Sequence, residues 1–506
     1  MLNFTKELSA QIRGLNSIIY ISLICLFLAF FYISKQSLWL DEYTSIQVAK
    51  QSLKKIVTGK AFDNHTPPFY YLLLHFWLKL GKNEFILRSL SVIFGILSIY
   101  LIYYLAKILF NNHIALMSAF LIAISPFHIY YCQEGRMYTL FMALSIAAII
   151  FFIKIINTNK FKHYLSFFLI SVIGLYTHYY FAFLLMAINL AFFYQYFIKK
   201  TAKNIKYWVL LQIFIALSLL PWLPILLKIA QTGGQHRKFV FSVIPYAFFR
   251  FNVGYAIFPL NIGVKENFLN SIFKHIWELI FIFSFFGILF LYGLKKILND
   301  KNNVTILLWL FFPALLSLII SLKMNIINER YLIVSFPAYV LLISLAILSI
   351  KKTILKNITI GVCCFVFLFS LSKYYFSKDF GKEQWRDVAK YISMHTKQKD
   401  LILVNAAFMK PLFCYYYQKC DSNVMGIKSK EDLLNILNLQ KINTFWLIHS
   451  HSNLNQDIIN TLKTKFLLIK NKIFPYETGI KVYCFKNKKN HKQVAFTNHN
   501  LLITSH

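Results

Sequence analysis

Residues 17–34 (SIIYISLICLFLAFFYIS) form an uncharged apolar run, and Trp39–Tyr43 (WLDEY) follows a few residues later. The length of the run predicts a membrane-spanning helix, because about 20 apolar residues cross the hydrocarbon core of a bilayer. Asp41 and Glu42 are therefore adjacent carboxylates at the end of the first span. Ionisable groups at the edge of a membrane are costly and usually functional, so this pair is the first candidate site.

The composition is that of a polytopic membrane protein. The 506 residues are 58% hydrophobic and 14% charged, whereas a soluble domain is about half apolar and about a quarter charged. The formal net charge is +35. Cytoplasmic loops and contact with anionic lipids account for such an excess, and no basic and aromatic stripe indicates a nucleic-acid-binding fold. We therefore expect membrane lipids, and no nucleic acid, as partners.

Further apolar runs bring the expected number of transmembrane helices to about eleven. They lie near residues 86–108, 114–132, 138–156, 165–180, 181–198, 207–229, 274–293, 304–322, 331–350 and 357–376. Lysines cluster in alternate loops, which the positive-inside rule places in the cytoplasm. The opposite loops hold nearly every candidate catalytic group, so we expect the active face to be extracytoplasmic.

The first outer loop, residues 35–85, is too long to be a simple connection. A periodic piece runs from Thr44 to Val57, and the pair Pro67–Pro68 favours a helix that begins near Phe69. The apolar segment that follows is too short to span a bilayer. We predict two interfacial helices along the outer leaflet.

The chain changes character after residue 376, where predicted strands alternate with predicted helices. The strands are 400–404, 444–448 and 480–485, and the helices are 383–395, 407–418, 430–438 and 453–465. This pattern predicts a small extracytoplasmic α/β domain. Cys414 and Cys420 are close enough to pair there if the compartment is oxidising. The expected domains are a transmembrane domain (1–376), the α/β domain (377–488) and a polar tail (489–506).

Charged residues of the outer loops are the candidates for chemistry. Arg136 lies in the turn between two spans with Glu134 and Tyr138, and a guanidinium fork matches the oxygens of a phosphate. The alternative is an ordinary ion pair within the turn. For Asp41 and Glu42, the alternative is that they only mark the end of a span.

Further candidates have equally simple alternatives. Arg88 is four residues after Glu84 and could form an intrahelical pair with it. Arg330 and Tyr331 open an outer end of a span and could be interfacial anchors.

His65 and His178 could hold a metal together with a carboxylate, although single histidines this far apart are a weak signal.

The motifs together resemble the GT-C superfamily of membrane glycosyltransferases, in particular the bacterial family-39-like group. That group is related to protein O-mannosyltransferases and to the aminoarabinose transferase of lipid A. The resemblance rests on Leu40–Glu42, His65–Leu73, Leu87–Ser91, Ser125–Tyr138, Arg330–Pro337 and Trp385–Ala389, and it is strongest over residues 35–145.

The resemblance implies transfer of a sugar from a polyprenyl-phosphate donor to an acceptor on the outer face, usually with inversion. Asp41 would be the general base, with Glu42 beside it. The expected donor contacts are Arg88, Glu134, Arg136, Tyr138, Arg330 and Tyr331. Some relatives act without a bound metal and others use one, so a divalent metal stays open and no other cofactor is expected.

Physical chemistry requires the same two kinds of group, cations and a carboxylate. A lipid phosphate is a good leaving group that needs cations to hold its charge, and an acceptor hydroxyl needs a carboxylate to take its proton. The acceptor would be a glycan, a lipid or a protein, and the location the plasma (inner) membrane. The alternatives are a transporter or flippase of lipid-linked sugars, and a ligase or polymerase of surface glycans.

Overall fold

The structure is a computed structural model that describes residues 2–60, 66–231, 243–257, 273–300, 303–377, 380–397, 400–439, 442–450, 456–475 and 479–488. The chain divides into two compact units. The first comprises Met1–Ile33 and Thr44–Phe376, and the second comprises Ser34–Tyr43 and Ser377–His506. The domain ranges expected from the sequence stay a prediction, and the polar tail lies outside the described residues.

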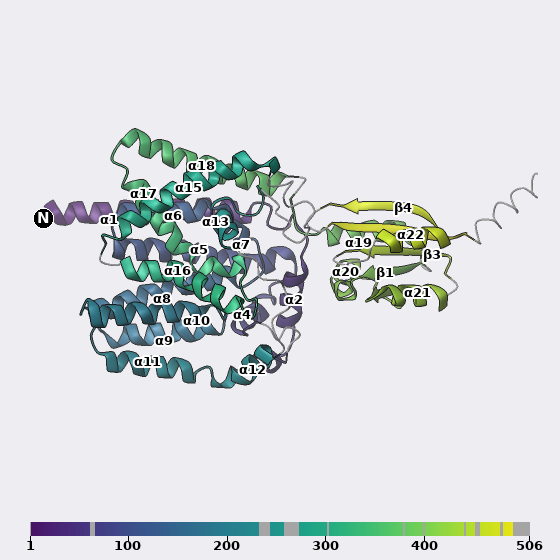
Figure 1. Cartoon of the computed structure of the whole chain (residues 1–506), viewed down its shortest axis with the longest axis horizontal. Coiled ribbons are helices and arrows are strands. Elements are labelled where there is room, and N and C mark those ends of the chain that lie inside the picture. The colour runs from purple at the N-terminus through teal and green to yellow at the C-terminus, as the bar shows by residue number, and fades with distance from the viewer. Residues whose placement is uncertain are drawn as a thin grey trace, which may run out of the picture. The chain divides into compact units, whose positions relative to one another are not determined.

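The first unit consists of apolar helices that pack side by side (Figure 1). They are α1 (Leu2–Phe30), α5 (Glu84–Leu109), α6 (Asn112–Ile124), α7 (Pro126–Cys132), α8 (Tyr138–Thr158), α9 (Phe161–Leu175), α10 (Phe181–Phe193), α11 (Ile205–Leu217), α12 (Leu223–Gln231), α13 (Val243–Val253), α15 (Ile276–Ile297), α16 (Asn303–Ser321), α17 (Phe336–Leu348) and α18 (Thr353–Phe376). A π-helical turn (Tyr194–Ile198) and 3₁₀ turns (Leu220–Trp222 and Glu329–Val334) extend α10 and precede α12 and α17.

Every predicted span overlaps one or two of these helices. Among the described residues, seven helices are long and apolar enough to cross a membrane, or eight if the bent pair α6–α7 is one span. Shorter apolar helices cover Asn16–Phe30, Phe161–Leu175 and Phe336–Leu348. The prediction of a polytopic α-helical membrane protein is confirmed, whereas the number of eleven spans stays a prediction.

The predicted span 114–132 is broken, because α6 and α7 meet at an angle of 60°. Ser125 caps the new helix, since its hydroxyl oxygen accepts a hydrogen bond from the amide of His128 at 3.3 Å. Pro126 occupies the first position of α7, where a missing N–H costs nothing. The break gives the polar turn after α7 a different direction from that of a straight span.

The described part of loop 35–85 contains three short helices, where two were predicted, because the piece from Thr44 to Val57 is divided between two of them. They are α2 (Leu40–Ala49), α3 (Leu53–Val57) and α4 (Phe69–Trp77). The helix start at Phe69 is confirmed, and the amide of Phe69 donates to the carbonyl oxygen of Tyr176 at 2.9 Å. Their position along the outer leaflet stays a prediction.

The second unit contains a five-stranded mixed sheet with the order β2-β1-β3-β5-β4. Its elements are α19 (Trp385–His395), β1 (Leu401–Asn405), α20 (Lys410–Tyr417), β2 (Val424–Ile427), α21 (Lys430–Leu439), β3 (Thr444–His449), α22 (Gln456–Lys465), β4 (Phe466–Phe474) and β5 (Ile480–Asn487). β1 pairs in parallel with β2 and β3, and β5 pairs antiparallel with β3 and β4. The prediction of a small C-terminal α/β domain is confirmed.

Two strands of this sheet, β2 and β4, were not predicted. β2 is only four residues long, and β4 begins directly after α22 without a turn residue to mark the boundary. β4 is an edge strand that exposes most of its side chains, so it lacks the apolar alternation of a half-buried strand. Cys414 and Cys420 form a disulfide, as their spacing suggested.

The close packing of α15 against α17 can be tested at Gly293. A Cβ at this position would overlap the carbonyl oxygen of Leu342, whereas a Cβ at Gly287 of the same helix would meet no atom within 4 Å. We expect Gly293→Val to lower the free energy of unfolding by about 1–3 kcal/mol, as overpacking does. Gly287→Val is the matched control and should unfold like the wild type. Thermal unfolding of the detergent-solubilised chain measures both, and equal stability of the two variants would refute the packing described here.

Candidate functional site

The turn between α7 and α8, residues 133–137, is polar and almost fully buried. Glu134 and Arg136 are 2% and 7% exposed. The amide of Arg136 donates to the carbonyl oxygen of Glu134 at 2.7 Å. The hydroxyl of Ser91 on α5 donates to the carbonyl oxygens of Glu134 (2.6 Å) and Arg136 (3.2 Å). These bonds fix the backbone of the turn, and with it the positions from which both charged side chains start.

Gln133 has a structural role in this turn. Its amide nitrogen donates to the carbonyl oxygens of Ala29 (2.9 Å) and Phe31 (2.7 Å) at the end of α1. Its amide oxygen accepts a hydrogen bond from the hydroxyl of Tyr374 on α18 at 2.9 Å. Gln133 therefore ties α1 and α18 to the turn.

The guanidinium of Arg136 connects the turn to the outer loop. Its Nη1 donates to the hydroxyl of Ser45 on α2 at 3.0 Å and to the hydroxyl of Tyr71 on α4 at 3.2 Å. Both partners are neutral hydroxyls, so these two bonds hold the cation in place without cancelling its charge.

His178 lies in the turn between α9 and α10, close to this cation. Its ring stacks on Phe141 (centroids 4.6 Å apart) and meets Tyr331 edge-on at 4.8 Å. Its Nδ1 accepts a hydrogen bond from the amide of Tyr180 at 3.2 Å, which leaves the proton of the neutral ring on Nε2. Burial, and then the charge of Arg136, lower the pKa of His178 to about 3. The residue is thus a neutral imidazole at physiological pH.

Arg330, Tyr331 and Tyr138 complete the cluster. Asn328 caps the 3₁₀ turn Glu329–Val334 by accepting from the amide of Arg330 at 3.2 Å. The hydroxyl of Tyr138, at the start of α8, interacts electrostatically with Arg330, Arg136 and Glu134. Six residues that were singled out in the sequence are therefore brought together in the first unit, from three separate turns: Glu134, Arg136, Tyr138, His178, Arg330 and Tyr331.

α13 supplies a cation that the sequence did not reveal, Arg250, which is 2% exposed. Its guanidinium carbon lies over the rings of Tyr246 (4.4 Å) and Tyr255 (4.7 Å). Its Nη1 donates to the carbonyl oxygen of Gly254 at 2.9 Å, and its Nη2 donates to the hydroxyl of Tyr246. The buried Nε has no hydrogen-bond partner among the described residues.

Tyr255 links Arg250 to the rest of the cluster. Its hydroxyl is 2.6 Å from the hydroxyl of Tyr131 on α7. Burial raises the pKa of Tyr255 well above its ordinary value, Glu329 raises it further, and Arg330 opposes this rise. Tyr255 therefore remains a neutral hydroxyl between the cations. The signal that could have identified this site is an arginine in an aromatic run, Tyr246–Tyr255.

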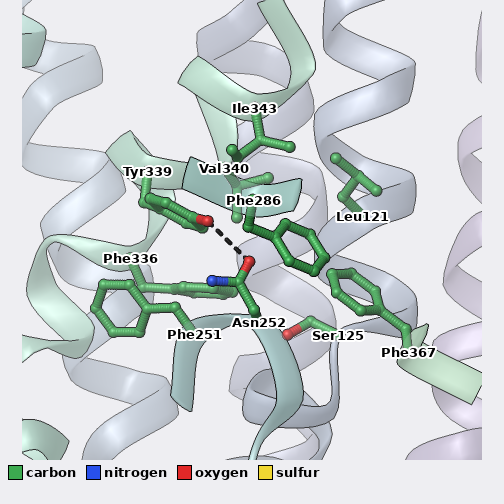
Figure 2. Close-up of a pocket in the computed structure, with 10 residues that line it drawn as sticks. All are labelled: Leu121, Ser125, Phe251, Asn252, Phe286, Phe336, Tyr339, Val340, Ile343 and Phe367. Carbon is green, nitrogen blue, oxygen red and sulfur yellow. Dashed lines mark hydrogen bonds between the residues drawn. The ribbon is translucent and has the colours of Figure 1, made fainter. Parts of the chain in front are cut away.

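A second polar contact on α13 is structural (Figure 2). The side-chain oxygen of Asn252 accepts from the hydroxyl of Tyr339 on α17 at 2.8 Å, and its nitrogen donates to the carbonyl oxygen of Phe248 at 2.7 Å. The neighbouring rings, among them Phe251 and Phe336, leave a cavity of about 10 Å³. This cavity has room for about one water molecule, so the contact holds α13 against α17 and binds no substrate.

Asp41 and Glu42 lie in the first turn of α2 and belong to the second unit. Glu42 is completely buried and forms an ion pair with Lys382, with 3.2 Å between Oε1 and Nζ. Its other oxygen accepts from the amide of Trp39 at 3.4 Å. Asp41 is half-buried. The two acids therefore differ in environment although they are adjacent in the sequence.

Comparison with known proteins decides the fold. A family model described as dolichyl-phosphate-mannose-protein mannosyltransferase matches residues 65–224. The structure is similar to ArnT from Cupriavidus metallidurans in the apo state, with a TM-score of 0.54 and 10% identity over 92% of this chain and 97% of that one. The chain has the GT-C fold.

Oligosaccharyltransferases share this GT-C fold. The chain is similar to AglB from Archaeoglobus fulgidus in complex with an inhibitory peptide and a dolichol-phosphate (TM-score 0.53, 12% identity, 87% of this chain and 69% of that one). It is also similar to the C. metallidurans ArnT bound to undecaprenyl phosphate (TM-score 0.52, 10% identity, 92% of this chain and 97% of that one). No curated protein matches the sequence significantly.

Arg88 and His65 are the other residues that were singled out in the sequence. Arg88 on α5 is 1% exposed, and its Nη1 donates to the carbonyl oxygen of Ile33 at 2.7 Å, beyond the end of α1. Its role as a donor contact stays a prediction. His65 lies outside the described residues. No three metal-ligating side chains lie together in the part of the chain that is described, so a metal site that includes His65 stays open.

The neutral state of His178 predicts a pH dependence of stability. As the pH falls below the ordinary pKa of 6.5, the unfolded chain binds a proton here, whereas the folded chain does so only near pH 3. The stability of the wild type therefore falls as the pH falls, by up to about 1.4 kcal/mol per pH unit from this residue. His178→Gln removes this contribution. The difference in unfolding free energy, wild type minus variant, should fall by about 2 kcal/mol from about pH 6.5 to about pH 4.5. A pH-independent difference would contradict the assignment.

Proposed function

We propose that the chain is an integral membrane glycosyltransferase. It transfers a sugar from a polyprenyl-phosphate donor to an acceptor hydroxyl or amine on the extracytoplasmic face, with inversion at the sugar. The observation that carries the proposal is the group of buried arginines, Arg136 and Arg250, that meets Arg330 and a set of neutral tyrosines in an apolar helical bundle. Solved GT-C structures with bound undecaprenyl phosphate and dolichol-phosphate support a donor of this class.

Fixed guanidinium groups suit a phosphate leaving group. The phosphate already carries negative charge, and its charge grows as the glycosidic bond breaks, so pre-positioned cations stabilise the transition state more than the ground state. Hydroxyls hold Arg136, and tyrosines and a carbonyl group hold Arg250. The Nε of Arg250 makes no hydrogen bond to the described residues. Arg330 is partly exposed and is the cation most accessible to a ligand. The surrounding apolar bundle strengthens each of these interactions by excluding water.

The neutral groups beside the cations have a separate role. Tyr138, Tyr331 and the imidazole of His178 present ring faces and hydrogen-bonding groups without adding charge. Such surfaces bind sugars, because rings pack against C–H faces and hydroxyls exchange hydrogen bonds. We assign these residues and Glu134 to the sugar of the donor, which is a hexose or a pentose.

Asp41 is the proposed general base, and Glu42 lies beside it. A positioned carboxylate that takes the proton of an acceptor hydroxyl contributes about 10²–10⁴ in rate. Glu42 has one oxygen paired with Lys382, so the half-buried Asp41 is the acid of the pair that we expect to meet the acceptor. The lysine-rich alternate loops favour the plasma membrane orientation in which these acids face outward.

Replacement of Asp41 tests the proposal. Membranes that contain the full chain are supplied with radiolabelled undecaprenyl-phosphate mannose or an undecaprenyl-phosphate pentose, and label transferred to endogenous acceptors is measured. We expect Asp41→Asn to reduce the transfer rate by about 10²–10⁴, because the amide cannot take the proton. Asp387→Asn is the matched control, since Asp387 is an exposed acid on α19 of the same unit.

Transfer by Asp41→Asn at close to the wild-type rate would reject Asp41 as the base. Counterflow of the lipid-linked sugar without a covalent product would reject the transferase and favour a transporter.

A further inference from the structure

The segment that carries Asp41 is held by residues of the same unit that are more than 300 positions later in the chain. Residues 382–386, which lead into and begin α19, bind the backbone and side chains of residues 34–37. The contacts are Ser37 Oγ to the Glu383 carbonyl oxygen (2.6 Å), the Lys382 amide to Gln36 Oε1 (3.2 Å), and the Arg386 guanidinium to the Ser34 carbonyl oxygen (3.1 and 3.2 Å).

The disulfide-closed turn at the end of α20 holds the next residues. The amide of Leu38 donates to the hydroxyl of Tyr416 at 2.7 Å. The ring of Tyr43 meets that of Tyr415 edge-on, with 5.9 Å between centroids. Both tyrosines lie inside the loop that the disulfide Cys414–Cys420 closes. The segment is therefore attached to the second unit on both sides of the acids.

Between these attachments lies the ion pair of Glu42 and Lys382. The two side chains are 0% and 4% exposed, so the ion pair is buried. Removing one partner of a buried pair is strongly destabilising, whereas the intact pair adds little net stability compared with apolar residues. Such a pair fixes one conformation more than it stabilises the fold. This suits Glu42, because the residue before it is Asp41, the proposed base.

The direction of Asp41 follows from that of Glu42. Adjacent residues of a helix point about 100° apart. Fixing the helix at Glu42 therefore also fixes the direction in which the side chain of Asp41 leaves the backbone. Both residues are in the first turn of α2. Asp41 remains half-buried while Glu42 is completely buried. The pair thus fixes one acid inside the second unit, while the other is half-buried beside it.

We propose that Lys382 is a positioning residue for the general base, and that the C-terminal unit orients Asp41 through the Lys382–Glu42 ion pair and the Tyr416 contact. The inference rests on the proposed function of Asp41. It gives the C-terminal unit a part in the transfer reaction that does not require it to bind the acceptor.

Hydrogen exchange tests the orientation independently of activity. The full chain in lipid nanodiscs is compared with Lys382→Met, Lys382→Arg and Lys390→Met, the last being a matched control at an exposed position of α19. We expect Lys382→Met to speed exchange of the amides of residues 38–43 by at least about tenfold, because an uncompensated buried charge favours local opening. Lys382→Arg should restore most of the protection, and Lys390→Met should leave it unchanged.

Tyr416→Phe provides a second variant that changes no charge. It removes the acceptor of the Leu38 amide, so exchange should increase there first. Wild-type exchange at residues 38–43 in both Lys382→Met and Tyr416→Phe would overturn the inference. An equal increase in Lys390→Met would overturn it as well.

The transfer assay with undecaprenyl-phosphate mannose or pentose then separates positioning from general damage. We expect Lys382→Met to lower kcat by about tenfold or more with the KM for the donor within about twofold, since the donor contacts lie elsewhere. In the Asp41→Asn background the same change should cost nothing further, because both act through one group. Additive losses would overturn the positioning role. No transfer by the wild type would instead reject the proposed function, and the exchange result would still decide whether Lys382 holds the segment.

Discussion

The hydrogen bonds of the buried Arg136 guanidinium join the turn 133–137 to the helices α2 and α4. A charge inside an apolar bundle is costly unless polar groups surround it. The hydroxyls of Ser45 and Tyr71 accept hydrogen bonds from this guanidinium, and Ser91 fixes the backbone of the turn that carries it. The outer-loop helices α2 and α4 therefore pack where they can hydrogen-bond to the cation. The two hydroxyls hold the guanidinium in position without bringing a negative charge to it.

The second unit also contains a buried charge, but there an opposite charge compensates it. Glu42 is as buried as a core leucine, and Lys382 neutralises it. The first unit thus keeps a cation whose described hydrogen bonds are to hydroxyls, and the second keeps an acid compensated by a cation. The proposed transfer needs both kinds of group, since a leaving phosphate needs positive charge beside it and a general base needs a fixed direction. We assign the first role to the cations of the first unit and the second role to the acids of the second unit.

The sequence predicted most of the fold, because apolar length and helix-starting residues are local signals. The helix at Phe69 and the spans show this. The strands β2 and β4 escaped, because β2 is only four residues long and β4 is an edge strand that exposes most of its side chains. The break at Ser125–Pro126 had a local signal, a capping serine before a proline, that the apolar run concealed. The distant partners of Gln133 and Glu42, which are Tyr374 and Lys382, leave no trace in the local sequence. Arg250 was missed for a different reason: its partners Tyr246 and Tyr255 are local, but the helix α13 that carries it was not predicted.

The central claim is that fixed cations in the helical bundle bind the phosphate of a polyprenyl lipid. Its most direct test compares binding of undecaprenyl phosphate and of uncharged undecaprenol to the full chain in nanodiscs, at low and high salt. The account predicts that the phosphate binds at least about tenfold more tightly, a difference of about 1.4 kcal/mol. This preference should persist at high salt, because buried pairs are poorly screened. Equal affinity for the two lipids would contradict it.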